Sequence, residues 1–147
     1  MDDIAALTHW LDDFANVISP ESRRLLMRQL ITGLRVRMRD RIKQQKDPEG
    51  IKFIPRKRDQ IGKIRRSGPM FQRIGTRIKT KSTPDYAQIG FAGRDGLIAT
   101  VHQDGLTQKP TKHSKPVRYP LRQLVGFSED DIHWIETTTL DFMSSKQ

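Results

Sequence analysis

Few side chains in this sequence have the types and spacing that catalysis or metal binding requires. The four histidines, His9, His102, His113 and His133, lie far apart, and the chain contains no cysteine. Structural zinc sites need such ligands in closely spaced pairs. The three acids that follow Ser128 are more simply explained as the first turn of a helix, where carboxylates interact favourably with the helix dipole. We therefore predict that the protein binds no metal or cofactor and is not an enzyme.

The pair His102-Gln103 is expected to have a structural role. It lies near the end of a short helix predicted over 97–105. Imidazole and amide groups can both donate and accept hydrogen bonds, so they can join the end of that helix to the adjoining loop. The expected structural motif comprises His102, Gln103, Gly105, Pro120 and Gly126.

Binding of negative charge is the chemistry that the composition supports best. The chain carries a net charge of +10, and twenty of its 27 Lys and Arg residues lie within 23–81. Residues 1–22 and 126–147 hold five acids each, with Lys146 as the single basic residue among them. The cationic middle could bind nucleic acid phosphates. It could equally bind the acidic ends of a neighbouring copy and so form a homo-oligomer.

A long helix over 19–46 is the element that would position much of this charge. Ser19 and Pro20 have the preferences of a helix start, as an N-cap and a first helical residue. Apolar residues recur every four positions from Leu26 to Ile42 and form a stripe that should face a core.

Basic residues occupy a separate arc of this helix and one face of a strand predicted over 74–81. Arg37 and Arg41 instead lie on the apolar side, so the last turns are expected to leave the core or to extend over its rim. The candidate residues for a subunit interface or a DNA-facing surface are Arg24, Arg28, Arg35, Arg39, Lys43, Arg77, Lys79 and Lys81.

The remaining patterns predict an α+β fold in a single domain, 1–147. A first helix over 2–17 should pair with the long second helix as a helical hairpin, 1–46, and a basic arm or loop follows over 47–73. Residues 74–125 should hold an antiparallel β-hairpin, the short helix and a polar loop. Residues 126–147 form the C-terminal helix.

Local signals give these later elements their expected limits. The strands of the hairpin are predicted over 74–81 and 86–91 from alternating apolar and polar residues, and the polar loop over 107–118. The last helix should begin with a capping box at Ser128. Its apolar side is predicted to consist of Ile132, Ile135 and Leu140.

Three segments, in this order, resemble a known family. They are DPEG followed by FIPR within 47–56, ATVHQDG at 99–105, and YPLRQLVGFSEDD at 119–131. The chain is similar to the phage virion morphogenesis (tail completion) family of contractile-tailed bacteriophages. The resemblance covers most of the chain, including the two N-terminal helices.

The resemblance implies a non-enzymatic virion protein at the head-proximal end of the tail, where related proteins form rings that finish the tube and permit head joining. It implies a hexameric ring, other neck and tail-tube proteins and passing DNA as partners, and assembly in the host cytoplasm before incorporation into the virion. No apolar run approaches the length of a membrane segment, so no membrane partner is expected. Acidic ends and a cationic middle suit a ring, because a repeated heterologous interface needs two complementary patches.

The alternative is a nucleic-acid-binding protein that uses its basic helix and strand to follow phosphates. The basic region has few aromatic residues for base stacking and no recognised reader motif, which weighs against this hypothesis. The salt dependence of DNA affinity distinguishes the two hypotheses, because DNA binding through phosphates weakens steeply with added salt.

Overall fold

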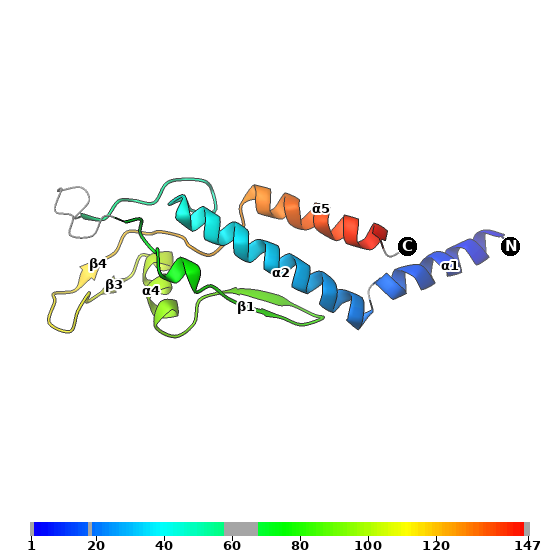
Figure 1. Cartoon of the computed structure of the whole chain (residues 1–147), viewed down its shortest axis with the longest axis horizontal. Helices are drawn as coiled ribbons and strands as arrows, with labels where there is room; N and C mark the ends of the chain where they lie inside the picture. Colours follow the sequence, from blue (N-terminus) through cyan, green and yellow to red (C-terminus); the bar gives the residue numbers. More distant parts are fainter. Residues whose placement is uncertain (1, 18, 58–67, 146–147) are drawn as a thin grey trace.

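The computed structural model describes residues 2–17, 19–57 and 68–145 and confirms the α+β class (Figure 1). The predicted arm over 47–73 therefore lies partly outside the described residues. The elements in chain order are α1 (Asp2–Val17), α2 (Pro20–Lys43), the short 3-10 helix η1 (Ile74–Thr76), β1 (Lys79–Ser82), β2 (Ala87–Gly90), α4 (Gly93–Asp104), β3 (Thr107–Gln108), β4 (Val117–Arg118) and α5 (Glu129–Ser145).

Helix α2 begins where its sequence signals indicate, but it ends at Lys43, three residues before the predicted end at Lys46. The Ser19 hydroxyl accepts a hydrogen bond from the backbone N–H of Ser22 at 3.3 Å, and Pro20 is the first helical residue. After the helix, the Asp47 carboxylate accepts bonds from the backbone N–H groups of Glu49 and Ile51, both at 2.9 Å. These bonds form the turn that separates α2 from the following segment.

The apolar stripe of α2 faces the core, as predicted. Leu30, Leu34, Met38 and Ile42 are buried, whereas Leu26 at the start of the stripe is only half-buried. The main core is formed around the C-terminal half of the helix by Met38, Ile42, Phe53, Met70, Ile74, Ile78, Ala99 and Leu124. Burial of these side chains is the main stabilising term of the fold.

Helix α5 runs antiparallel alongside α2 and is its helical partner (Figure 1). The two helices approach closely where Trp134 lies over Gly33. A Cβ added at Gly33 would lie 2.2 Å from an atom of the Trp134 ring, so only glycine allows this contact. The guanidinium of Arg37 lies 5.7 Å from the centre of the same ring.

Helix α1 has the predicted limits, but it does not fold back along α2 as a helical hairpin requires. It continues outward beyond the start of α2 and forms one end of an elongated molecule (Figure 1). Ile4, Leu7 and Leu11 remain 70%, 56% and 49% exposed. The elements that pack along α2 are instead α5 and the β1–β2 hairpin.

The β-hairpin forms with the predicted antiparallel pairing, although its first strand begins later than expected. Lys79 pairs with Gly90 and Ser82 pairs with Ala87. Residues 74–76 form η1 instead of strand, because the turn places Ile74 and Ile78 together in the core, where both are buried. The spacing of apolar residues alone could not distinguish a strand from a 3-10 turn over 74–76.

The later elements depart from the predictions in three places. Helix α4 begins at Gly93, before the predicted start, and ends at Gly105, whose φ of 62° is the left-handed conformation of a helix C-terminus. The loop 107–118 contains the short antiparallel pair β3–β4. In α5, Ile132 and Leu140 are exposed, and the side facing α2 carries Asp131, Trp134 and Thr138 instead.

The capping box at the start of α5 forms as predicted. The backbone N–H of Asp131 donates to the Ser128 hydroxyl, and the backbone N–H of Ser128 donates to the Asp131 carboxylate, both at 3.0 Å. Among the helices described, none combines the length and the apolar character needed to cross a bilayer.

Candidate functional site

Arg122, in the characteristic segment 119–131, connects this segment to the two others, within 47–56 and at 99–105. Its side chain is buried, with the residue 4% exposed. The guanidinium donates to the carbonyl oxygens of Ile54 at 2.7 Å and Pro55 at 3.2 Å, and to Nδ1 of His102 at 3.1 Å. Its backbone N–H donates to the His102 carbonyl at 2.7 Å. The planar guanidinium presents five donors in a fixed fork, and the three donors of a lysine ammonium could not reproduce this geometry.

The contacts of His102 determine its protonation state. Because a guanidinium can only donate, Nδ1 of His102 accepts the bond from Arg122 and the ring is neutral with its proton on Nε2. Burial and the positive charge of Arg122 lower the pKa of His102 to about 4. The ring also makes edge contacts with Phe71 and Tyr119, at centroid distances of 4.8 Å and 5.0 Å. His102 thus links the end of α4 to two loops.

Gln103 makes the second set of bonds between α4 and the segment before α5. Its Nε2 donates to the Val125 carbonyl at 2.9 Å. Its Oε1 accepts from the backbone N–H groups of Leu124 at 2.8 Å and Val125 at 3.0 Å. These bonds satisfy the backbone of an extended segment that has no strand partner, as buried polar groups require.

The low pKa of His102 predicts a specific dependence of stability on pH. In the unfolded chain the imidazole titrates near its ordinary value of 6.5, whereas in the folded chain it titrates at about 4. Between these values the unfolded state binds the extra proton, so His102 makes the free energy of unfolding rise as pH increases from 4 to 6.5. Melting curves across this range should show a smaller rise for His102→Gln than for the wild type.

The matched control for this prediction is His113→Gln, because His113 is exposed. Its melting temperature should follow the wild-type pH profile. Parallel profiles for the wild type and His102→Gln would show that His102 keeps an ordinary pKa.

A second buried polar cluster, which the sequence patterns did not predict, holds α5 against α2. The Asp131 carboxylate accepts from Nε of Arg37 at 2.7 Å and from Arg41 at 3.4 Å. Arg41 also donates to the carbonyls of Leu124 at 2.6 Å and Gly126 at 3.0 Å. The signal in the sequence was the placement of two arginines, four residues apart, on the apolar side of α2. They meet a buried partner there instead of leaving the core.

The electrostatic interactions in this cluster favour the charged forms of Asp131 and Arg41. Burial alone would raise the pKa of Asp131, but hydrogen bonds from Arg37 and Ser128 outweigh burial and hold it below its ordinary value. Burial lowers the pKa of Arg41, and the charges of Asp131 and Asp47 oppose that effect. Breaking such a pair leaves one uncompensated buried charge, which is strongly destabilising.

The basic residues of α2 that were predicted to face a partner are all exposed; they are Arg24, Arg28, Arg35, Arg39 and Lys43. Arg39 contacts the adjacent Asp40 at 3.3 Å. In the hairpin, Lys79 and Lys81 are exposed, and Lys81 lies 5.9 Å from the Tyr86 ring centre. Arg77 is paired with Asp95 at 2.7 Å. Strand β1 packs on α2, so these two cationic sets lie on neighbouring elements.

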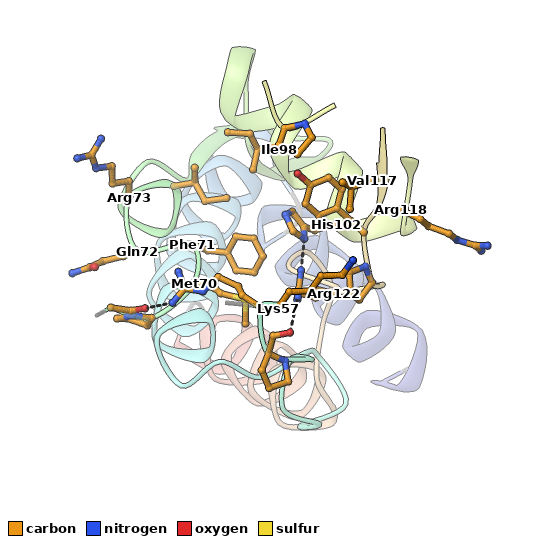
Figure 2. Close-up of a pocket in the computed structure, with 18 residues that line it drawn as sticks. Lys57, Met70, Phe71, Gln72, Arg73, Ile98, His102, Val117, Arg118 and Arg122 are labelled. Carbon is orange, nitrogen blue, oxygen red and sulfur yellow. Dashed lines mark hydrogen bonds between the residues drawn. The ribbon is translucent and has the colours of Figure 1, made fainter. Parts of the chain in front are cut away.

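A cavity of about 800 Å³ opens beside the His102–Arg122 network (Figure 2). Phe71 and His102 point into it, and Tyr119 also lines it. Lys57, Arg73, Arg118 and other basic residues also line it, and Figure 2 shows Arg73 and Arg118 extending away from its centre. The predicted motif residue Pro120 belongs to its wall. Within 2–17, 19–57 and 68–145, no acidic residue lines it.

The described residues offer no arrangement for metal chemistry. Across 2–17, 19–57 and 68–145, no three His, Asp or Glu side chains gather closely enough to hold a metal ion. The polar network instead bonds to backbone groups and connects segments. Its chemistry is therefore that of a structural junction, with exposed charge and open cavities as the features available to partners.

Comparison with known proteins agrees with the resemblance of the three segments. The model of the phage virion morphogenesis family matches residues 2–144. The chain is 33% identical over 130 residues to tail completion protein S of Escherichia phage P2, covering 84% of this chain and 85% of that relative. No solved structure matches. The chain belongs to the phage virion morphogenesis family.

Proposed function

We propose that this protein is a non-enzymatic structural component of a phage tail that completes the tail during virion assembly. The observation that carries the proposal is the family match over residues 2–144, together with the similarity to a tail completion protein over 84% of the chain. The His102–Arg122 network agrees with this family match, because it connects the three characteristic segments through part-buried hydrogen bonds.

We further propose that the protein acts as a hexameric ring at the head-proximal end of the tail, where it contacts neck and tail-tube proteins and enables head joining. The exposed cationic arc of α2 supports this proposal, because the acidic ends of the same chain provide a complementary surface. A contact between two different patches repeats around an axis and closes into a ring without self-matching. Electron microscopy of the purified protein, alone and with tail tubes, tests this location.

Reversing three charges of the α2 arc should prevent ring formation. The side chains of Arg28, Arg35 and Arg39 are exposed, so Glu at these positions should not disturb the core. Each exposed ion pair contributes only a few tenths to about 1 kcal/mol, but six contacts in a ring multiply the loss. Sedimentation should show rings for the wild type and folded monomers for the triple variant, at unchanged melting temperature.

The matched control reverses Lys109, Lys112 and Lys115, which are also exposed and change the net charge equally. This second variant should still form rings. Loss of rings in both variants would mean that net charge, and not the α2 arc, governs assembly. Rings that persist in the α2 variant would refute the interface.

The exposed basic arc also favours one second candidate function, which is binding of DNA as it passes through the neck. If α2 contacts phosphates, wild-type affinity for duplex DNA should fall steeply with salt, and the triple reversal should flatten that dependence. Binding at two salt concentrations, measured beside sedimentation, separates the two functions. Rings that persist while DNA binding disappears would favour the DNA-facing role.

A further inference from the structure

Helix α1 carries an apolar face that the described part of the chain leaves open at Ile4, Leu7 and Leu11. Ile4, Leu7 and Leu11 follow helical spacing, and all are exposed. The helix contains four aspartates and no Lys or Arg. An exposed amphipathic helix of this kind is suited to a hydrophobic groove on another surface.

The cavity beside His102 has the complementary chemistry. Met70, Phe71 and Tyr119 provide apolar and aromatic surface, and Ile98 contributes from α4 (Figure 2). Among the described residues, the lining includes basic side chains and no acid. At about 800 Å³ the cavity is large enough for several side chains of a docked helix.

The segments that line the cavity, among them α4 and β4, lie toward the opposite end of the molecule from α1 (Figure 1). The cavity is near the C-terminal end of α2, where the Met70 backbone N–H donates to Gln45 at 2.9 Å. At 1.5 Å per residue, the 24 residues of α2 span about 36 Å, whereas the 16 residues of α1 span about 24 Å. Because α1 is attached at the start of α2, it cannot reach the cavity of its own chain.

We propose that α1 of one copy docks its apolar face into the His102 cavity of a second copy. Leu7, at the centre of the face, enters the aromatic part of the cavity, and the negative charge of α1 lies near Lys57, Arg73 and Arg118. The contact joins unlike ends of two copies, so each copy in a dimer keeps one unoccupied end. Further copies can add at that end, or the row of copies can close into a ring. This inference rests on the proposed ring and adds a second contact between neighbouring copies, beside the one proposed for the cationic arc of α2.

Cross-linking tests the contact directly, because the chain contains no cysteine. A Leu7→Cys chain mixed with an Ile98→Cys chain should form a dimer with a short bismaleimide, and mass spectrometry should identify the joined peptides. A chain with both substitutions should form a ladder. Thr137→Cys, which replaces an exposed residue of α5, is the control and should not link to position 7. Equal linking to position 137, or none to position 98, would overturn the docking.

A mixing experiment tests the same contact without cross-links. Leu7→Asp places a carboxylate on the docking face of α1, and Ile98→Asp places one in the cavity wall, so each should prevent docking. Both residues are exposed enough for the fold to stay intact. Each variant alone should sediment as a monomer, whereas an equal mixture should form dimers and nothing larger. Leu140→Asp, at an exposed apolar residue of α5, should assemble like the wild type. Wild-type assembly by either of the first two variants would refute the proposal.

The outcome for the docking contact can be separated from that for the proposed function. If the 7–98 link forms but the protein never associates with tails, the docking stands and the tail role fails. If the protein completes tails without a 7–98 link, the tail role stands and the docking fails.

Discussion

Ile42→Asp is expected to unfold the protein at room temperature. Ile42 is 2% exposed and packs in the main core with Phe53 and Leu124. Placing a carboxylate there costs several kcal/mol, because the group loses its hydration without gaining a partner. The free energy of unfolding of small domains is only about 5–15 kcal/mol, so a cost of this size can cancel the stability of the fold. Circular dichroism should show loss of helix and of a cooperative melting transition.

The matched control is Val36→Asp on the same helix. Val36 is 41% exposed, so its carboxylate keeps most of its hydration. The melting temperature of this variant should stay close to that of the wild type. Equal destabilisation by the two substitutions would mean that the effect comes from negative charge on α2 and not from burial.

Arg122→Ala is expected to have the second largest effect. The substitution leaves the Ile54 and Pro55 carbonyls and Nδ1 of His102 without their donor. A buried polar group that loses its partner costs about 1–3 kcal/mol, so we expect a total loss of at least about 3 kcal/mol in the free energy of unfolding. Urea denaturation measures this loss. Arg122→Lys should recover little of it, since an ammonium group cannot reproduce the planar fork.

Two further measurements distinguish this effect from a general loss of positive charge. Arg118→Ala removes an exposed arginine of the same segment and should change the stability by less than about 0.5 kcal/mol. In folded Arg122→Ala, the pKa of His102 should rise, because the Arg122 charge that lowers it is gone. A His102 pKa that NMR titration finds unchanged would show that the two side chains are not coupled.

Several features of this protein were predictable from local sequence because they depend on near neighbours. The start of α2 follows from Ser19 and Pro20, and its buried stripe follows from apolar residues at helical spacing. The capping box at Ser128 and the end of α4 at Gly105 are likewise local. The family was recognisable from three short segments because their order and residue types are characteristic in combination.

Other predictions failed where competition between distant segments decides the outcome. A helix pattern over 2–17 indicates an apolar face but not which surface covers it, and α5 and the β-hairpin occupy the sides of α2 that α1 was expected to use. Ile132 and Leu140 have helical spacing but are exposed, because Trp134 and Asp131 make the contact with α2. The spacing of apolar residues does not show which of two helix faces will pack against a shared partner.

The sequence by itself determined where the charges lie, where the long helix begins and which family the chain resembles, since these are properties of single residues and their near neighbours. Only the tertiary structure brought Arg122 to Ile54 and His102, and Asp131 to Arg37 and Arg41. It also placed the apolar face of α1 and the cavity at opposite ends. Such contacts span many residues of chain, and they form only where packing of the whole core excludes water and brings buried polar groups to partners on distant segments.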